Sequence, residues 1–431
     1  MRGFGSSGRG DRASRRGRRG YRRAARAAWP NRGLALLLVA GGALLGWWLP
    51  HAERSRHLGG LSYDPSAAQA TLGAIASGVI TLTGFVLTAV TLVVQSVQAM
   101  SPRLVGVLGY FERSLVLFGA LTGTAVYALV VLAQVSDEHV PRLSVTLAIV
   151  FVVLSSGAIL RSLAELREVV TGGGLVRTVG LQLHAALDRE WREPEGPAAG
   201  PGNADGEIAA DQAGVVQRVD GAALAATAAR LGVRVTGLVA VGSYTEPGAP
   251  LLRVSPAAPA AGARELARAV RVGPARHIEH DPAYGLRLLV DVAIRALSPA
   301  VNDPTTAVQT LDQIESVLLR IATRPLGPAV IRDADGTARV TLARPGWDVL
   351  LDLALAEILL YGADSLQIQR RLRALLDTLT RAAPQPRATS FAAYRAALNR
   401  TAQTLPDPSL TTTATTPDPQ GLGGPPPSDR A

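Results

Sequence analysis

The sequence TLGAIASGVITLTGFVLTAVTLVVQSVQAM, residues 71–100, contains no charged side chain. Small and polar residues recur in it at steps of three or four, which places them on one face of an α-helix. This face, the polar stripe, consists of Ala70, Ala74, Ser77, Thr81, Gly84, Thr88, Thr91, Gln95 and Gln98. The opposite face is apolar and consists of Ile75, Val79, Leu82, Val86, Ala89 and Val93. The stretch therefore predicts a membrane-spanning helix with one polar face, although Thr83 and Ser96 lie off it.

Two interpretations fit the polar stripe. Small side chains and hydroxyls allow close helix packing, in which backbones approach and Ser or Thr side chains bond across helices. The same pattern suits the lining of a water-filled path formed by several copies of the helix around an axis. The two are compatible, because an oligomer interface can surround a pore. The candidate residues for either role are Ser77, Thr81, Gly84, Thr88, Thr91, Gln95 and Gln98.

Three further apolar runs predict that the chain crosses the membrane four times, because each is close to the roughly 20 residues that a hydrocarbon core requires. Trp29 precedes the first run, and Trp47 and Trp48 end it, as expected of aromatic residues at the two interfaces. A cleaved signal peptide is the alternative for this run, but residues 49–51 do not form a small-residue cleavage site. The predicted spans are residues 33–49, 72–94, 115–135 and 143–160.

The predicted spans contain no Asp, Glu, Arg or His. Proton-coupled carriers depend on an ionisable group within the membrane, so a pump or exchanger of this kind is disfavoured. A passive conduit and a structural membrane anchor remain. In the third span, Gly119 and Gly123 have the spacing of a close helix contact, for which we expect a packing role.

The net charge of +10 belongs to the N-terminal arm, residues 1–32, which contains eleven arginines and one acid. The rest of the chain is neutral overall, so we expect no nucleic-acid partner. A basic segment before a span stays in the cytoplasm, so four spans predict cytoplasmic N- and C-termini. The arm could also bind anionic lipid at the bilayer surface. The alternative is a disordered arm that only sets the topology.

The absence of cysteine and lysine excludes several kinds of chemistry. Without cysteine there are no disulfides, thiolate metal sites or iron–sulfur clusters. Without lysine there is no Walker A lysine and no Schiff-base lysine. The six histidines are scattered, and His277 and His280 have no evident third metal ligand. We therefore expect no enzyme, no cofactor and no metal site.

The sequence after residue 163 predicts a cytoplasmic α+β region. The expected fold class is therefore a mostly helical membrane protein, with four transmembrane helices followed by a cytoplasmic α+β region. One part alternates as β-strands do and resembles the small barrel-sandwich modules of biotinyl and lipoyl domains, without the lysine that carries their prosthetic group. The Pro/Thr-rich end predicts disorder, apart from a short helix at residues 391–400. The predicted parts are residues 33–163, the transmembrane domain; 164–192, connecting helices; 193–210, a linker; 211–256, the β module; 262–382, a helical module with one helical stretch over 264–296; and 383–431, a disordered tail.

Several stretches resemble one family of bacterial predicted membrane proteins, domain of unknown function 2254. They are FVLTAVTLVVQSVQAMSPRLV (residues 85–105), VGPARHIEHDPAYGLRLLVDVAIRALSPAVNDPTTAVQTLD (272–312), DQAGVVQRVD (211–220) and the turn GSYTEPGAPL (242–251). The resemblance covers about residues 33–380 and implies a four-span inner-membrane protein with a cytoplasmic C-terminal domain. It implies no catalytic residues.

Polar residues within the second of these stretches are the candidates for a cytoplasmic site. Their charges alternate in sign, which suits structural ion pairing, and a helix-capping and pairing role is the alternative to a binding site. Asp303 followed by Pro304 is a strong helix start. The candidates are Asp281, Arg287, Asp291, Arg295, Ser298, Asn302, Asp303, Thr305 and Asp312.

Together these patterns predict a homo-oligomer in the bilayer whose second span lines a channel or permeation path. The alternative is a membrane scaffold or sensor that conducts nothing and acts through its cytoplasmic domain.

Overall fold

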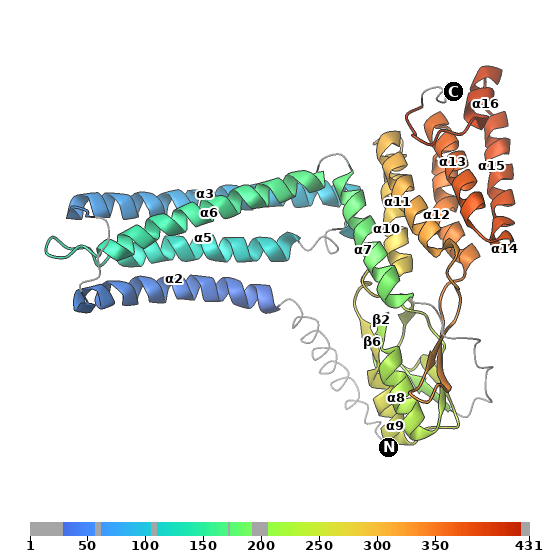
Figure 1. Ribbon diagram of the computed structural model, residues 1–431, viewed down its shortest axis with the longest axis horizontal. Helices are drawn as coiled ribbons and strands as arrows, with labels where there is room; N and C mark the ends of the chain where they lie inside the picture. The colour runs from blue at the N-terminus through green and yellow to red at the C-terminus, as the bar shows by residue number, and fades with distance from the viewer. Residues whose placement is uncertain (1–28, 57–61, 105–109, 171–172, 192–205, 424–431) are drawn as a thin grey trace, which may run out of the picture. The chain divides into compact units, whose positions relative to one another are not determined.

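The structure is a computed structural model that describes residues 29–56, 62–104, 110–170, 173–191 and 206–423 (Figure 1). Contacts within the chain divide it into two compact units. We call them the membrane unit, residues 1–171, and the C-terminal unit, residues 172–431. Most of the N-terminal arm, residues 1–28, lies outside the described residues.

The membrane unit contains four helices that are long and apolar enough to cross a membrane, as predicted. In it, α5 lies between α2 and α3, and α6 lies beside α3 and α5 (Figure 1). The helices are longer than the apolar runs, because polar residues continue them beyond the hydrocarbon length. At 36 residues, α3 is about 54 Å long, against roughly 30 Å of hydrocarbon. Their bounds are α2 Trp29–Arg56, α3 Pro65–Met100, α5 Tyr110–Leu132 and α6 Arg142–Val170.

Glycines set the contact between α2 and α5. A Cβ atom on Gly123 would lie 2.5 Å from the carbonyl oxygen of Leu38, and one on Gly119 would lie 2.5 Å from the Cα atom of Ala35. From the other side, a Cβ atom on Gly42 would lie 2.2 Å from the carbonyl oxygen of Gly123. The two backbones are therefore in direct contact, which confirms the packing role predicted for the third span.

The first span departs from its prediction at its end. Helix α2 continues through Pro50 and carries Glu53, which is 6% exposed, into the bundle. The Glu53 carboxylate accepts hydrogen bonds from the backbone N–H groups of Leu143 (3.0 Å) and Ser144 (2.7 Å), and from the Ser144 hydroxyl. These groups open α6, where N–H donors lack helical partners and a negative charge is favourable. Glu53 therefore lies beyond the predicted span, residues 33–49, and caps a helix.

The C-terminal unit contains two open β-sheets. The larger has the strand order β1-β5-β3-β8-β7, and the smaller has the order β4-β2-β6. Helices α8 (Gly221–Leu231) and α9 (Ala260–Arg268) pack on them, and Val216, Leu224 and Leu266 are fully buried between these elements. The strands are β1 Gly206–Ala209, β2 Gly214–Val219, β3 Arg234–Gly237, β4 Tyr244–Thr245, β5 Pro250–Ser255, β6 Val270–Gly273, β7 Ala329–Arg332 and β8 Ala338–Leu342.

These sheets correct three predictions. The barrel-sandwich module is not confirmed, because neither sheet closes and the larger one recruits β7 and β8 from far along the chain. Strand β8 pairs in parallel with β3, with Val235 opposite Val340. The predicted helical stretch at residues 264–296 is interrupted by β6, and the predicted linker ends early because β1 begins at Gly206.

Helices form the rest of the C-terminal unit, and α10, α11 and α13 pack on their neighbours along buried apolar faces (Figure 1). The predicted disorder of the tail is wrong over residues 385–390 and 404–423, whereas the short helix predicted at residues 391–400 is confirmed as α15. Phe391, Leu398 and Ala414 of this segment are buried, and α16 packs on α13. The helices are α7 Gly174–Glu190, α10 Pro282–Ala296, α11 Pro304–Ala322, α12 Trp347–Tyr361, α13 Leu366–Ala382, α14 Gln385–Ala388, α15 Phe391–Gln403 and α16 Pro408–Thr415.

The glycine contact predicts a position-specific loss of stability. Gly123→Ala places a methyl group against the α2 backbone, and we expect it to lower the free energy of unfolding of the membrane unit by about 2 kcal/mol or more. Gly157→Ala on α6 is the control, because a Cβ atom there meets nothing within 4 Å. Thermal unfolding in detergent compares the two variants. Equal midpoints would show that the α2–α5 contact does not hold the unit together.

Candidate functional site

The polar stripe of α3 faces away from the other helices of its own chain. All nine of its residues, from Ala70 to Gln98, are exposed. The opposite face is the packed one: Val79, Val86 and Val90 are buried against α5 and α6. The predicted apolar face is thus largely the buried one, except for Leu82, which is 42% exposed.

The hydroxyls of the stripe use their protons on their own helix. Ser77 donates to the carbonyl oxygen of Gly73 at 2.9 Å, and Thr81 to that of Ser77 at 2.9 Å. Thr88 and Thr91 donate to the carbonyl oxygens four residues earlier at 3.1 and 2.8 Å. A hydroxyl that donates within its helix avoids the cost of an unpaired donor in lipid. Its oxygen still presents acceptor capacity outward.

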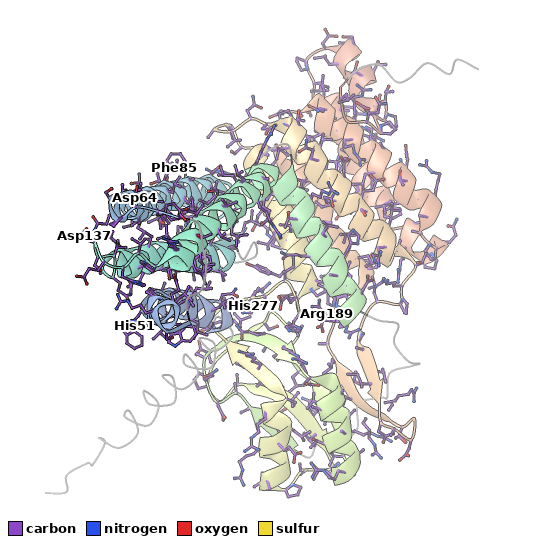
Figure 2. The ribbon with its side chains drawn as sticks, turned by 60° about the vertical axis from the view of Figure 1, so that its left-hand side comes forward. His51, Asp64, Phe85, Asp137, Arg189 and His277 are labelled. Carbon is purple, nitrogen blue, oxygen red and sulfur yellow. The ribbon has the colours of Figure 1, made fainter. Side chains whose placement is uncertain are left out.

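The surface around the stripe is open and otherwise apolar. A Cβ atom on Gly84 would meet nothing within 4 Å, so no packing within the chain requires a glycine there. On either side Ile80, Phe85 and Leu92 are 55%, 67% and 60% exposed, and Figure 2 shows Phe85 on the outer surface of α3. The stripe is therefore a polar seam in a lipid-type surface. Because its residues are exposed, it can contact a neighbouring molecule or face a water-filled path.

The polar candidates of the C-terminal unit occupy three separate places on α10, α11 and the turn between them. Asp281 caps α10, accepting from the Tyr284 N–H at 3.0 Å, and Asp303 caps α11, accepting from the Thr306 N–H at 3.0 Å. Asn302 forms the turn between the helices with a φ of 47°, in the left-handed region that Asn tolerates.

Arg287 of α10 forms an ion pair with α12, a partner helix that the spacing of charges along α10 does not indicate. Arg287 donates to Asp291 at 2.7 Å and also to both carboxylate oxygens of Glu357 on α12. The hydrogen bonds between Arg287 and Glu357 raise the pKa of Arg287 and lower the pKa of Glu357. Arg295, four residues after Asp291, is exposed at the surface. The candidates therefore do not converge on one site, and the contacts of Arg287, Asp291, Asp281 and Asp303 are those of capping and pairing.

The remaining polar candidates also lie at helix ends or on helix faces. The Ser298 hydroxyl donates to the carbonyl oxygen of Arg295 at 2.7 Å, and Thr305 lies in the first turn of α11. Asp312, further along α11, accepts from Arg371 of α13 at 2.8 Å.

Asp281 differs from the other helix caps in its burial. Its residue is 5% exposed, and its Oδ2 atom is buried without a hydrogen-bond partner, 3.9 Å from Arg276. Burial raises the pKa of this carboxyl above the ordinary value for Asp, while the Tyr284 N–H and Arg276 act in the opposite direction. Gly242 is needed beside it, because a Cβ atom there would lie 2.3 Å from Asp281 Oδ2 at a φ of 92°.

The histidines near Asp281 do not assemble a metal site. His280 pairs with Glu190 of α7 at 2.7 Å, and Arg189 of α7 donates to the carbonyl oxygen of Glu279 at 3.1 Å. Figure 2 labels Arg189 on α7 and His277 in the segment before α10. Within the described part of the chain, no group of three or more His, Cys, Asp or Glu side chains could hold a metal ion.

Three buried arginines of α13 were not among the candidates, and one of them, Arg371, pairs with Asp312. Arg370 and Arg373 are 2% and 6% exposed, although charged side chains are rarely buried. Their only signal is the sequence RRLR in an amphipathic helix, which ordinarily indicates a solvated face.

The sequence matches a family described as predicted membrane protein, DUF2254, over residues 26–378. The chain belongs to this family. The matched range includes the four membrane helices, the polar stripe, both sheets and the three buried arginines of α13. It ends before α14, so α15, α16 and the chain that follows them lie outside it.

Individual relatives agree with this assignment. Uncharacterized proteins of Mycobacterium bovis and Mycobacterium tuberculosis are each 30% identical to the chain over 260 residues, which cover 57% of this chain and 50% of theirs. The chain thus spans about half the length of the curated relatives it matches. No solved structure matches it.

The buried carboxyl of Asp281 predicts a pH-dependent stability. A raised folded-state pKa means that Asp281 stabilises the fold at low pH, and that this contribution is lost as the pH rises through the folded-state pKa. Asp281→Asn keeps the cap and removes the buried charge. We expect its unfolding temperature in detergent to exceed that of the wild type at pH 7, with the difference closing toward about pH 4. Asp303→Asn is the control and should gain nothing at pH 7. Parallel profiles for Asp281→Asn and the wild type would contradict this account.

Proposed function

We propose that this membrane protein self-associates through the polar stripe of α3, and that the copies of the stripe line a permeation path. The observation that carries the proposal is the exposure of the stripe. A polar face that packed against α5 or α6 would be a structural feature of one chain, whereas this one is free to meet other molecules.

The membrane environment supports association over exposure to lipid. Gln95 and Gln98 carry amides, and the hydroxyls of Thr81 and Thr88 keep acceptor oxygens on the outer surface. Hydrocarbon satisfies none of these groups, while water in a path or polar groups of another copy would satisfy them. Gly84 and the neighbouring small residues would let two such helices approach closely.

The composition of the stripe favours passive conduction. It contains no Asp, Glu, Arg or His, so it offers no site for a proton relay. Glu53, a buried acid of the bundle, already accepts hydrogen bonds from the first N–H groups of α6. We therefore propose a path without coupled chemistry and without an enzymatic step.

The proposed setting is a bacterial inner membrane, with both termini in the cytoplasm. Support comes from the arginine-rich arm before α2, which by the positive-inside rule stays in the cytoplasm, and from the even number of spans. We propose that the arm also contacts anionic lipid headgroups, at about 1 kcal/mol per arginine near the surface.

The alternative is a scaffold or sensor that conducts nothing and acts through the C-terminal unit. One observation favours it: α12 exposes Val349 (61%), Leu360 (69%) and Tyr361 (51%), an apolar surface suited to a protein partner. This alternative predicts that reconstituted protein carries no current, whereas deletion from Gly214 onward abolishes partner binding.

Conductance tests the proposed path directly. Purified protein in a planar bilayer should carry current. Thr88→Leu and Gln95→Leu replace polar groups of the stripe by apolar ones, and each should lower the conductance by about tenfold or more, because a dewetted constriction raises the barrier to permeation. Ser96→Leu is the matched control, since Ser96 is exposed on α3 but lies off the stripe. Absence of current from the wild type, or an unchanged conductance of Thr88→Leu, would overturn the proposal.

A further inference from the structure

The C-terminal end of the described chain covers the buried arginines of α13. We call residues 408–423, which comprise α16 and the turn after it, the C-terminal strap. Arg370 donates to the carbonyl oxygens of Thr416 and Gly423, both at 3.0 Å. Arg373 donates to the carbonyl oxygen of Ala414 at 2.9 Å. The strap thus offers the arginines the carbonyl end of a short helix, which favours positive charge.

These partners are neutral carbonyl groups. The carboxylate of Asp377, one turn further along α13, acts on the pKa of Arg373 in the direction opposite to burial. No carboxylate of the described residues lies within 4.0 Å of either guanidinium, although buried arginines are normally paired with acids. The Nη2 atom of Arg373 is buried and has no hydrogen-bond acceptor. Burial and, to a lesser extent, Arg395 lower the pKa of Arg373. Main-chain carbonyls and the Asn399 amide are therefore incomplete substitutes for an anion.

The strap carries a carboxylate that does not serve this purpose. Asp418 is 7% exposed and accepts hydrogen bonds from the backbone N–H groups of Gln420 (3.1 Å), Gly421 (3.0 Å) and Gly423 (2.8 Å). The Asp418 carboxylate therefore stabilises the turn of the strap itself and does not pair with either arginine. The adjacent Arg371, by contrast, pairs with Asp312 and Glu315 of α11, so the structure does supply acids to a neighbouring arginine.

The strap also buries little apolar surface against the rest of the unit. Ala414 is the buried residue of α16, and Leu422 is 75% exposed. Segments with little buried apolar surface open at low free-energy cost. The family match ends at residue 378, so it includes both arginines and excludes the strap.

We propose that Arg370 and Arg373 form a binding site for a phosphate-type oxyanion, and that the C-terminal strap occupies this site until such an anion displaces it. The two residues are three apart on α13 and share one face. Two guanidiniums on one face can bind the oxygens of a phosphate group by paired charge-assisted hydrogen bonds. The same chemistry occurs in free phosphate and in the phosphomonoester headgroup of phosphatidic acid. This inference does not rest on the proposed permeation path.

Hydrogen exchange of the full-length protein tests the displacement. In detergent, inorganic phosphate should accelerate amide exchange in residues 408–423 by about tenfold over chloride at equal ionic strength, because bound anion excludes the strap. A parallel measurement in phosphatidylcholine vesicles, with and without phosphatidic acid, tests the lipid headgroup. Acceleration by free phosphate assigns the site to a soluble anion, and acceleration by phosphatidic acid alone assigns it to a lipid.

Three variants test the site itself. Gly421→Ala should loosen the strap, because Gly421 has a φ of 64° and a Cβ atom there would lie 2.5 Å from Val308 Cγ1. We expect it to bind phosphate about tenfold more tightly than the wild type, since less strap competes. Arg370→Gln and Arg373→Gln should abolish phosphate binding, while Arg400→Gln, at an exposed arginine, should leave it unchanged.

The contrary result is equally specific. If neither phosphate nor phosphatidic acid changes the exchange of the strap in the wild type, the strap is a fixed part of the fold and the proposal is wrong. This measurement decides the matter even if Gly421→Ala fails to fold. Phosphate binding that survives both Arg370→Gln and Arg373→Gln would also overturn it.

Discussion

The hydrocarbon of a membrane offers no hydrogen-bond partner, and the membrane unit is organised by this constraint. Inside the bundle several buried polar groups find partners within the chain. Glu53 binds the first N–H groups of α6, and the Tyr127 hydroxyl donates to the Ser144 carbonyl oxygen at 3.0 Å. The glycines of α2 and α5 bring backbones together where side chains would separate them. On α3 the polar stripe faces outward, while Val79, Val86 and Val90 of the opposite face pack in the bundle.

The outward orientation of the polar stripe needs a physical reason. A single chain has no reason to place Gln95, Thr88 and Thr81 on a lipid-facing surface, because leaving them there costs free energy and stabilises nothing in that chain. The arrangement is favourable when another copy, or water held between copies, covers the face. Many polar groups of the C-terminal unit are paired in the same way: Arg287 has two carboxylates and Asp303 has two donors. Asp281 and Arg373 each bury one atom without a hydrogen-bond partner, and there we expect sensitivity to pH and to an anion.

Local patterns in the sequence predicted much of this structure. Apolar runs predicted four spans, the three-and-four spacing predicted the two faces of α3, and Asp303–Pro304 predicted the start of α11. These features depend on residues within one helix or one turn, so a short window of sequence contains the necessary information.

What the sequence did not predict depends on partners far apart in the chain. The pairing of β3 with β8 joins residues about 100 positions apart, and without β8 the strands after Gly206 resemble a small closed module. The tail is poor in apolar residues and was expected to be disordered, but Arg370 and Arg373 hold its carbonyl groups. The N–H groups that Glu53 binds lie about 90 residues further along. None of these partners is visible within a local window.

The central claim is that the polar stripe of α3 meets another copy of itself. The chain contains no cysteine, so single-cysteine variants report only the position that is changed. Oxidation in native membranes should link Ser77→Cys, Thr81→Cys and Thr88→Cys into disulfide dimers, and should leave Leu82→Cys, exposed on the opposite face, monomeric. Cross-linking at Leu82 with none at the three stripe positions would contradict the account.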